Sequence, residues 1–579
     1  MPLGSAHFRQ KVESFLASCG LRFEPMDAWY GIQADDGSLL AGAGIAGSTI
    51  KCVAVADNLR GEGLLPKLIS HIISLHQGEN LRVFTKPEYR IQFESLGFRL
   101  LASAPEAILL ENGRGLQDYC DYLSSCAGVV VSQTVASRPL PPSGKPVCKQ
   151  ASSPAFPPVG PSLLRGRGWP RVCDTTPRTP LGVIVMNANP FTKGHKYLID
   201  KALEEVEELV VIPVKEDAQE FTYEERKGMI EKACEGLPVT VAEGSDYSIS
   251  AFTFPTYFLK DLSSAAEMQM RLDLDLFARH IVPALGASVR FVGTEPNDPL
   301  TARYNELMKE ILPIPVVEVE RLPGVSASRV RAGGWKETAA MTPASTHPYL
   351  LARLMHKAMM AELDTPLKPG LVGPDGNGAH SDMDYALMKR GADAIRRSFV
   401  AHIDLLPDLA AFGKAIEADA LAATGGVNTH RGAIFALGLA ACSALMGVPV
   451  GRLAAGLEQP EGTHGAEAPE AKGALKMAQG GYRELFEDWL PYYRSLEGDC
   501  FRMQKTLLKI MSGLDDTCII HRAGMNTALL IKKESFALLD DFNEEKLINF
   551  VDWMNSGKVS PGGSADMLAL TVFIQALNT

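Results

Sequence analysis

The stretch LGVIVMNANPFTKGHKYLIDKALEEVEE, residues 181–208, decides the fold of the central part of the chain. The apolar run 183–186 is typical of a buried strand, and from Lys193 onward the pattern changes to that of an amphipathic helix. Side chains four residues apart lie on one face of a helix. Those that we expect to face a sheet are Leu198, Ala202 and Val206. The segment therefore predicts a strand, a turn and a helix, the unit from which α/β domains are built.

The turn between this strand and this helix carries groups that suit a phosphate. Asn189 lies in the turn, and Thr192 and His195 lie at the start of the helix, where backbone amides and the helix dipole favour an anion. Gly194 leaves room for a nucleotide to approach the backbone. A histidine at this place can donate hydrogen bonds to phosphate oxygens while charge builds on a leaving pyrophosphate. The alternative is a helix-capping threonine beside a histidine with local partners.

A second motif favours the phosphate site. It is GVSASRVR, residues 324–331, a serine-rich turn that opens a helix. The pair of motifs resembles the T/HxGH nucleotidyltransferase superfamily, which cuts the α–β bond of a nucleoside triphosphate. The resemblance implies that the residues acting on the phosphates are Thr192, His195, Ser328 and Arg329, the arginine through a fork of donors that suits phosphate oxygens. It also implies that the nucleotide is bound by Asn189, Gly194 and Ser326.

Other candidates follow the remaining strands of the central block. FVGTEP, residues 291–296, ends a strand where the superfamily holds its nucleotide base, and its candidate residues are Gly293, Thr294 and Glu295. Lys215 follows the second strand, and Arg226 lies in TYEERKGMI. For both basic residues a surface salt bridge is the alternative to nucleotide binding.

Composition limits the classes of protein to which this chain can belong. The chain has 579 residues, 46% hydrophobic and 22% charged, which is ordinary for a globular protein of several domains. Lys and Arg total 57 against 68 Asp and Glu, so the formal charge of −11 argues against a general nucleic-acid binder. Ten scattered cysteines without a CxxC pair suit reduced thiols in the cytoplasm. The apolar stretch 433–446 is too short to span a bilayer, so we expect no membrane partner.

Two seams divide the chain. Residues 127–180 are rich in Pro and Ser and lack periodicity, so we predict a flexible linker there. Near residues 332–346, Gly, Thr and Pro interrupt the pattern. The sequence predicts a multidomain chain, with α/β blocks over 1–120 and 181–332 and an all-α block over 346–579. The strand-like runs of the α/β blocks include 53–56, 83–85, 183–186, 209–214 and 290–293.

In the first block, Arg60, Gly61 and Gly63 lie between an apolar strand and an amphipathic helix. Glycines before a helix let backbone amides approach a pyrophosphate, although a purely structural turn is the alternative. Together with FTKPEYRIQFESLGF, the segment resembles the GCN5-related acetyltransferase fold. Asn58 stands where that family usually has Gln or Arg, and we find no catalytic base. We therefore expect these residues to bind a CoA-like pantetheine arm without acetyl transfer.

The resemblance of the first two blocks is closer than a superfamily. VMNANPFTKGHKYLI, GSDYSISAFTFPTYFLKD, RFVGTEPND, YNELMKEILP and VSASRVR together resemble citrate lyase ligase. That family combines an acetyltransferase-like domain with a Rossmann-like nucleotidyltransferase domain, in the order expected here. The resemblance implies that ATP and acetate form acetyl adenylate, and that the acetyl group passes to the prosthetic-group thiol of the citrate lyase acyl carrier protein within the citrate lyase complex.

The third block contains four polar clusters beside apolar helices. They lie in TPLKPGLVGPDGNGAHSDMDY, ATGGVNTHRGAIFALGL, DDTCIIHRAG and SPGGSADMLAL. Buried polar groups are costly, so function explains four such clusters better than helix capping does. The residues expected to bind ligand are Lys368, Asn377, His380, Gly426, Asn428, His430, Ser560, Gly563 and Ser564. Carboxylates among these groups suit Mg²⁺ held together with phosphates, and its expected ligands are Asp382, Asp384, Asp515 and Asp516.

These clusters resemble triphosphoribosyl-dephospho-CoA synthase, an all-α family. The resemblance implies transfer of a triphosphoribosyl unit from ATP to the ribose 2′-hydroxyl of dephospho-CoA, with loss of adenine. One stretch departs from the family, because residues 473–482 read GALKMAQGGY where the family has an acidic GARGEAE-like run. Glu467 and Glu470 lie close enough in sequence to substitute for the missing carboxylates.

We therefore predict a bifunctional maturation enzyme of citrate lyase, with a ligase part and a synthase part. Two alternatives remain open at this point. One is an active ligase with an impaired C-terminal part, and the other is a non-catalytic scaffold that docks the carrier protein. Acetate-dependent release of pyrophosphate distinguishes the ligase from the scaffold, and release of adenine distinguishes the synthase from an impaired part.

Overall fold

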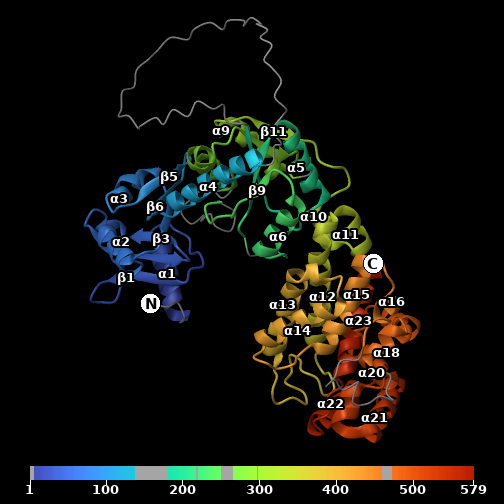
Figure 1. Ribbon diagram of the computed structural model, residues 1–579. Helices are drawn as coiled ribbons and strands as arrows, with labels where there is room; N and C mark the ends of the chain where they lie inside the picture. Colours follow the sequence, from blue (N-terminus) through green and yellow to red (C-terminus); the bar gives the residue numbers. More distant parts are fainter. Residues whose placement is uncertain are drawn as a thin grey trace, which may run out of the picture. The chain divides into compact units, whose positions relative to one another are not determined.

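The computed structural model describes residues 6–136, 180–216, 220–248, 265–296, 298–458 and 473–578 (Figure 1). Their contacts define two compact units that interleave along the chain. The first unit comprises Met1–Asn187, Tyr197–Tyr223 and Cys234–Leu322, and the second comprises Ala188–Lys196, Glu224–Ala233 and Pro323–Thr579. The protein is multidomain, with α/β sheet regions followed by a helical C-terminal part.

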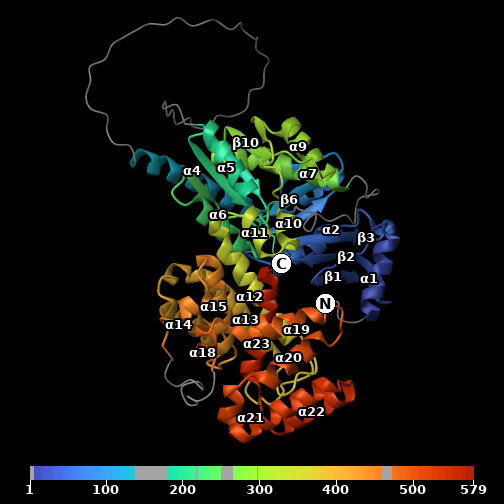
Figure 2. The ribbon, with the colours of Figure 1, turned by 90° about the vertical axis from the view of Figure 1, so that its right-hand side faces the viewer.

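The first sheet has six strands in the order β1-β2-β3-β4-β6-β5. Figure 2 labels β1, β2, β3 and β6 of this sheet. The strands are β1 (Ala28–Gln33), β2 (Leu39–Ala46), β3 (Thr49–Val55), β4 (Leu81–Thr85), β5 (Arg99–Ser103) and β6 (Ile108–Asn112). All neighbours are antiparallel except β3 and β4, which run parallel and pair only at Thr49–Arg82 and Ile50–Val83. These two strands therefore part after a short common stretch.

Helices cover both faces of this sheet. The helices of this region are α1 (Ala6–Ser18), α2 (Leu64–Leu75), α3 (Arg90–Glu94) and α4 (Gly115–Ala136). The amphipathic helix predicted after Gly63 is confirmed as α2, because Leu68 and Ile72 are buried against the sheet. Beside them the rings of Phe93 and Phe98 meet edge to face at 5.4 Å. Helix α1 and the start of α4 pack on the opposite face.

The second sheet is parallel, with five strands in the order β11-β10-β7-β8-β9. The strands are β7 (Leu181–Met186), β8 (Glu208–Pro213), β9 (Val239–Val241), β10 (Val289–Gly293) and β11 (Val316–Val319), which confirms the predicted runs of this block. The chain adds β8 and β9 on one side of β7 and β10 and β11 on the other. Ligands of open parallel sheets bind outside the carboxyl ends of the strands where the order reverses, here between β7 and β10.

The helices of this region are α5 (Lys193–Glu205), α6 (Tyr223–Cys234), α7 (Ala265–Leu276), α8 (Val282–Leu285) and α9 (Pro299–Ile311), with a π-helical turn, η3 (Phe277–Ile281), between α7 and α8. In α5, Ala202 is buried and Val206 follows the helix end buried as predicted. Leu198 is only half-buried, and its neighbour Ile199 is fully buried instead. The buried face therefore consists of Ile199, Ala202 and Val206, which differs from the predicted face at one position.

Within the first unit the two sheets share a core. The Ser103 amide donates a hydrogen bond to Asp275 over 2.7 Å, and the hydroxyl of Ser124 on α4 donates to the Ala284 carbonyl over 2.8 Å. Helix α4 continues to Ala136, which corrects the predicted start of the linker at residue 127. The rest of that predicted linker, residues 137–179, lies outside the described residues.

The second seam is also corrected. Within residues 332–346, where an irregular connection was expected, the chain forms α11 (Trp335–Met341) and the short 3-10 turn η4 (Ala344–Thr346). Trp335 packs against the core of the helical part, so burial of this side chain outweighs the interrupted pattern. Helix α10 (Ala327–Ala332) precedes this segment, and α12 (His347–Leu363) follows it directly.

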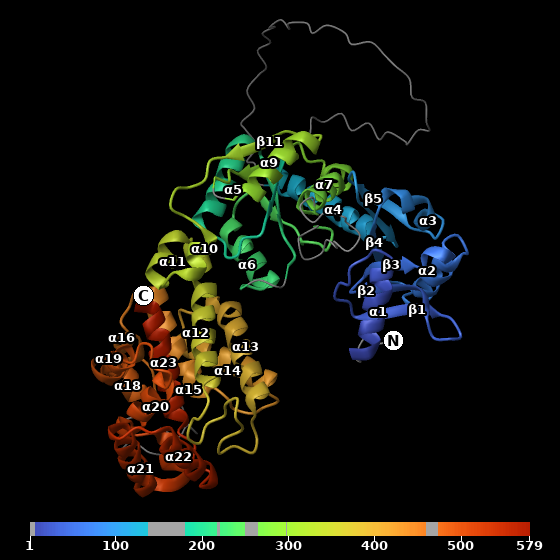
Figure 3. The same cartoon turned by 180° about the vertical axis from the view of Figure 1, so that it is seen from behind.

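The C-terminal part is helical over the described residues, apart from an isolated bridge between Gly373 and Gly376 (Figure 3). Its further α-helices are α13 (Tyr385–Ala401), α14 (Leu409–Ala423), α15 (Arg431–Met446), α16 (Val450–Ala454), α18 (Ala474–Gln479), α19 (Leu490–Ser495), α20 (Arg502–Gly513), α21 (Thr517–Asp540), α22 (Glu544–Ser556) and α23 (Gly562–Asn578), with a 3-10 turn, η5 (Ile403–Leu405), and a π-helical turn, η6 (Leu485–Trp489). In the part of the chain that is described, no helix is both long and apolar enough to cross a bilayer.

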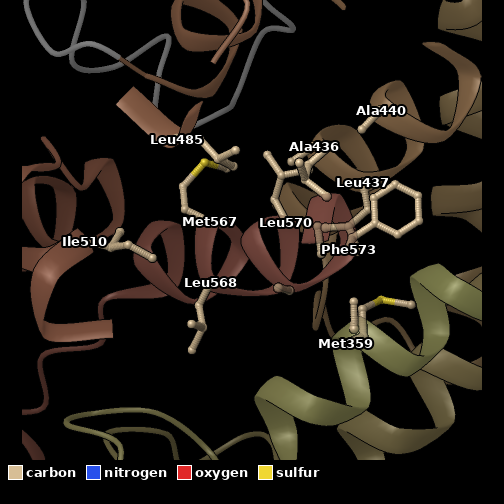
Figure 4. Packing of buried hydrophobic residues seen from close by; sticks show 14 of the residues in the cluster. Met359, Ala436, Leu437, Ala440, Leu485, Ile510, Met567, Leu568, Leu570 and Phe573 are labelled. Carbon is tan, nitrogen blue, oxygen red and sulfur yellow. The ribbon is translucent and has the colours of Figure 1, made fainter. Parts of the chain in front are cut away.

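Helix α23 lies at the centre of the helical core. Figure 4 shows its residues Leu570 and Phe573 beside Ala436 and Leu437 of α15. Both α15 and α12 pack against α23. The polar clusters predicted from the sequence lie at the ends of these buried helices, so the core fixes their positions.

Candidate functional site

The turn after β7 holds the imidazole of His195 in one orientation. The backbone amide of Thr192 donates a hydrogen bond to Nδ1 of His195 over 3.0 Å, and the Thr192 hydroxyl lies 2.9 Å from the same nitrogen. The Phe191 ring stacks on the imidazole with centroids 5.5 Å apart. Because a backbone amide can only donate, Nδ1 accepts, and a neutral imidazole carries its proton on Nε2. The ring is therefore prepared to donate a hydrogen bond through Nε2.

The serine-rich turn is organised around the start of α10. Ser326 caps this helix by accepting a hydrogen bond from the Arg329 amide over 3.3 Å, and its hydroxyl lies 2.6 Å from that of Ser328. Arg329 is half exposed, donates to the Gly324 carbonyl over 2.8 Å and pairs with Glu337. Its guanidinium thus lies at the surface in a weak, exposed ion pair with Glu337. A phosphate can take the place of the Glu337 carboxylate.

The two motifs lie against each other in the second unit. A side-chain carbon added at Gly194 would lie 3.7 Å from Cγ1 of Val325, and the Arg331 guanidinium donates a hydrogen bond to the Asn189 carbonyl. Arg331 belongs to the second motif, but the sequence did not single it out as a site residue. The sequence carries no signal for this contact, because Arg331 and Asn189 are 142 positions apart. The structure brings both phosphate motifs together.

The other candidates of the central block have local partners. Thr294 accepts a hydrogen bond from the Arg321 amide over 3.2 Å, and Glu295 pairs with the Arg321 side chain. Both residues follow Gly293 at the carboxyl end of β10, where the strand order reverses. Lys215 is half exposed and lies 3.4 Å from Asp246, which agrees with the surface salt bridge considered as its alternative.

Arg226 differs from Lys215, because its side chain is completely buried. The surface salt bridge considered as its alternative is therefore wrong. A buried guanidinium needs partners for its donors, so Arg226 acts within the fold around α6.

In the first sheet, the glycine loop before α2 has the conformation that only glycine adopts readily. Gly61 and Gly63 have φ angles of 94° and 75°, and a side-chain carbon added at either would meet nothing within 4 Å. Gly63 is the N-terminal cap of α2. Arg60 pairs with Asp57 at 2.7 Å, and both side chains are exposed. The loop follows the end of β3, beyond the short stretch in which β3 and β4 pair.

The helical part encloses a cavity of about 880 Å³ within the second unit. All four polar clusters contribute to its wall. The predicted site residues that line it are His380, Asp382, Asn428, His430, Asp515, Asp516, Ser560 and Gly563. Of the other predicted residues, Asn377 and Gly426 are exposed outside the lining, and Lys368 and Ser564 are buried behind it.

Buried polar groups support the cavity wall. The Lys368 ammonium donates to the Glu362 carboxylate over 2.5 Å, and both side chains are almost completely buried. Burial lowers the pKa of His430 to about 4, and the positive charge of Lys368 acts in the same direction. Nε2 of His380 lies 2.9 Å from the Ser560 hydroxyl, and burial lowers the pKa of this histidine too. Both imidazoles are therefore favoured in the neutral form.

The four predicted metal ligands have different surroundings. Asp384 caps α13 and accepts a hydrogen bond from the Leu387 amide over 2.7 Å, and it is absent from the cavity lining. Asp516 caps α21 and also accepts from the Ser564 amide and hydroxyl over 2.7 and 2.8 Å. Asp515 pairs with Lys532. Among the described residues, no group of three or more His, Cys, Asp or Glu forms a metal cage.

The cluster SPGGSADMLAL also supplies a carboxyl group that was not assigned a role from the sequence. Asp566 on α23 lines the cavity, and burial raises its pKa well above the usual value, as do the nearby carboxylates of Asp516 and Glu362. A side-chain carbon at Gly432 would lie 1.8 Å from Oδ2 of Asp566, so α15 approaches this carboxyl group only because residue 432 is glycine. The sequence shows both residues, but not that two segments so far apart converge.

The stretch that departs from the acidic family pattern also reaches the cavity. It forms α18, whose residues Leu475 and Met477 line the wall. Two of the changed positions thus give the wall apolar side chains. The possible substitutes, Glu467 and Glu470, lie outside the described residues.

Comparisons with known proteins divide the chain at α12. The family model "Citrate lyase ligase C-terminal domain" matches residues 181–350, and the model "ATP:dephospho-CoA triphosphoribosyl transferase" matches residues 348–465 and 457–579. A [Citrate [pro-3S]-lyase] ligase of Haemophilus influenzae is 34% identical over 362 residues, which cover 58% of this chain and 94% of the relative.

Other relatives match the helical part, among them the following two. A probable 2-(5''-triphosphoribosyl)-3'-dephosphocoenzyme-A synthase of Stutzerimonas stutzeri is 34% identical over 264 residues, 39% of this chain and 91% of the relative. The 2-(5''-triphosphoribosyl)-3'-dephosphocoenzyme-A synthase of Klebsiella pneumoniae is 31% identical over 260 residues, 39% of this chain and 93% of the relative.

Proposed function

This chain belongs to the citrate lyase ligase family and, in its helical part, to the triphosphoribosyl-dephospho-CoA synthase family, and we propose how its residues carry out the two reactions. It is a bifunctional enzyme of citrate lyase maturation. One part activates acetate with ATP and acetylates the prosthetic-group thiol of the citrate lyase acyl carrier protein. The other part makes triphosphoribosyl-dephospho-CoA from ATP and dephospho-CoA. Both reactions use ATP, a cytoplasmic substrate, which supports the proposal that the enzyme acts in the cytoplasm.

For the ligase, the contact between the two motif turns carries the proposal. Acetate oxygen attacks the α-phosphorus of ATP, the bond to the β-phosphate oxygen breaks, and pyrophosphate leaves. His195 donates from Nε2 to a phosphate oxygen as this charge develops, and Thr192 fixes the imidazole through Nδ1. Arg329 leaves its ion pair with Glu337 and donates hydrogen bonds to the β- and γ-phosphates. Ser326 and Ser328 lie beside it. Asn189 and Gly194 form the backbone wall of the nucleotide pocket.

The order of the parallel strands supports a Rossmann-like nucleotidyltransferase fold for residues 181–332. Numbered along the chain, the strands lie in the order 5-4-1-2-3, and this fold binds nucleotide at the carboxyl ends where the order reverses. Gly293, Thr294 and Glu295 follow β10 at that edge and hold the base. Lys215 follows β8 and reaches a phosphate when it leaves Asp246, whereas Arg226 supports the pocket from within α6.

The first sheet then presents the acceptor thiol. Its parted strands β3 and β4 suit an extended pantetheine arm, and the loop Arg60, Gly61 and Gly63 suits the attached phosphate, as in GCN5-related acetyltransferases. The thiolate attacks the acetyl carbon of acetyl adenylate, the bond from that carbon to the phosphate oxygen breaks, and AMP leaves while the thiol proton passes to water.

Contacts within the first unit support this placement of the thiol. The Arg82 guanidinium on β4 donates to the Asp246 carbonyl over 2.6 Å, and Asp246 lies in the segment that follows β9. The Tyr247 hydroxyl donates to Glu111 on β6. These contacts hold the start of β4 beside a segment that leaves the carboxyl edge of the parallel sheet, where the adenylate would form.

For the synthase, the cavity of about 880 Å³ supports the proposal, since it is within the usual size for small-molecule sites and all four clusters meet in it. The 2′-hydroxyl of dephospho-CoA attacks C1′ of the ATP ribose, the C1′–N9 bond breaks, and adenine leaves with a proton. The binding residues are His380, Asn428, His430, Ser560 and Gly563 in the wall, with Lys368, Asn377, Gly426 and Ser564 shaping it from behind or at its rim.

The carboxylates of the wall fit Mg²⁺ held mainly by substrate. Mg²⁺ is commonly bound by one or two carboxylates together with phosphates rather than by an all-protein cage. Asp382 and Asp515 line the cavity with partly exposed carboxylates and would hold it, whereas Asp384 and Asp516 use their oxygens as helix caps. When bound, Mg²⁺ would neutralise charge on the triphosphate.

One observation favours a second candidate function, an active ligase with an impaired synthase part. Leu475 and Met477 place apolar side chains in the wall where the synthase family has an acidic run. Incubation of the full chain with deacetylated citrate lyase, ATP and acetate tests the ligase through recovered lyase turnover. Incubation with ATP, dephospho-CoA and Mg²⁺ tests the synthase through released adenine. Lyase recovery without adenine would favour the second candidate, and neither product would refute both.

A further inference from the structure

Helix α12 reaches both candidate sites of the second unit. Near its start, Arg353 is buried and donates a hydrogen bond from Nη2 to the backbone carbonyl of Arg331 over 3.2 Å. Near its end, Glu362 reaches the cavity of the helical part, where it pairs with Lys368. The same helix therefore supplies one side chain to each site, and its position constrains both.

The hydrogen bond from Arg353 continues into the first phosphate motif. Arg331 accepts from Arg353 through its carbonyl and donates through its guanidinium to the carbonyl of Asn189. Asn189 lies in the turn that leads to Thr192 and His195. Two consecutive hydrogen bonds thus connect the helical part to the backbone of the turn that holds the imidazole.

A second contact ties the helical part to α6. Nε and Nη2 of Arg396 on α13 donate to the two carboxylate oxygens of Glu225 over 2.6 and 2.7 Å, and both side chains are largely buried. A side-chain carbon at Gly228 would lie 2.4 Å from the Tyr349 hydroxyl, so α6 and α12 approach closely only because residue 228 is glycine. A paired and partly buried guanidinium fixes geometry better than an exposed one.

We propose that Arg353 is a positioning residue of the ligase ATP site, through which the synthase part holds the two phosphate motifs together. The inference rests on the proposed ligase function for its kinetic consequences, although its structural consequence is independent of it. With the hydrogen bond in place, Arg331 is held against the Asn189 carbonyl, and the turn carrying His195 keeps the geometry that ATP requires. Without it, the turns separate more often and ATP binds less tightly.

The primary test compares Arg353→Met with Arg353→Lys in the full chain, with Lys357→Met as a control at an exposed position of the same helix. Met keeps most of the apolar volume and removes all donors, whereas Lys keeps a charged donor. Loss of a hydrogen bond from a charged donor predicts a KM for ATP in pyrophosphate release raised roughly tenfold in Arg353→Met, with kcat changed less. Arg353→Lys should recover most of this loss, and Lys357→Met should match the unchanged enzyme.

Hydrogen exchange provides a readout that does not depend on activity. We expect amides of residues 187–194 and 324–331 to exchange faster in Arg353→Met than in Arg353→Lys, without faster exchange in α23. Equal exchange and an equal KM in the two variants would overturn the inference. If the unchanged chain releases no pyrophosphate, the proposed ligase function fails, and the exchange comparison still decides the inference.

A second test does not depend on the folding of Arg353→Met. It reverses the charges of the Glu225–Arg396 ion pair. Arg396→Glu places two carboxylates against each other, so it should raise the KM for ATP and speed exchange in α6. The double variant Glu225→Arg with Arg396→Glu restores an ion pair and should return both quantities toward those of the unchanged enzyme. If neither Arg396→Glu nor the double variant changes the KM for ATP, the helical part does not support the ATP site.

Discussion

The Thr192 amide donates a hydrogen bond to Nδ1 of His195 over 3.0 Å, which makes Nδ1 an acceptor and leaves the proton of the neutral ring on Nε2. This hydrogen bond fixes both the position of the His195 ring and the nitrogen that carries its proton. It depends on the spacing of three residues between positions 192 and 195 at a helix start. The hydroxyl of Thr192, 2.9 Å from the same nitrogen, reinforces the arrangement.

His195→Ala should lower the kcat of acetate-dependent pyrophosphate release by about 10²- to 10³-fold, the usual effect of removing one donor from developing charge. Adenine release by the synthase part should be unchanged, because the cavity residues are elsewhere in the sequence and keep their own partners. Parallel assays of pyrophosphate and adenine measure both. Retention of full pyrophosphate release would show that the imidazole has no part in the reaction.

Gly432→Ala should abolish most adenine release while leaving pyrophosphate release intact. The new methyl carbon would lie 1.8 Å from Oδ2 of Asp566, so α15 or the carboxyl group must move. Gly438→Ala is the matched control on the same helix, since a carbon there meets nothing within 4 Å. Equal adenine release by both variants would mean that the wall around Asp566 does not determine synthase activity.

Low pH should destabilise the helical part through His430. Its pKa is lowered to about 4 in the fold by burial, so the unfolded chain binds the proton more readily. Stability from the neutral ring is present above about pH 6.5 and is lost as pH falls toward 4, by about 2 kcal/mol at pH 5. Urea unfolding of the unchanged chain and of His430→Gln, at pH 7 and pH 5, measures this. An identical change with pH in both proteins would remove His430 as the cause.

Lys368→Met should destabilise the helical part by about 3–5 kcal/mol, because it leaves the Glu362 carboxylate buried without its cation. The double variant Glu362→Met with Lys368→Met removes both charges and should recover much of that loss in free energy of unfolding. Denaturant unfolding of the two variants provides the comparison. A single variant as stable as the unchanged chain would show that water or another donor satisfies Glu362.

The sequence predicted the elements that depend on local pattern. The strands over 183–186 and 290–293 are present within slightly longer strands, and the buried helix expected over 433–446 is α15. These segments are largely continuous apolar runs, and their lengths distinguish a short buried strand from a long buried helix, so a single sequence suffices. The phosphate motif of Thr192 and His195 was also predictable from local sequence, because the two residues lie three positions apart at one helix start.

The misses depend on contacts between distant segments. Trp335 makes the second seam helical by packing on a core that only the folded chain forms. Arg331 was overlooked because its partner, the Asn189 carbonyl, is 142 positions away. The importance of Gly432 appears only when Asp566 is beside it. That Asp384 and Asp516 cap helices was likewise not predicted, and their expected role as metal ligands stays a prediction.

A double-mutant cycle on His195 and Arg329 tests the central claim most directly, namely that the two motifs hold the same triphosphate. The readout is kcat/KM for ATP in acetate-dependent pyrophosphate release by the full chain. If both side chains act on one transition state, His195→Ala combined with Arg329→Ala should lose little more than the worse single variant. Two losses that simply multiply, or an Arg329→Ala variant with unchanged kcat/KM, would contradict the account.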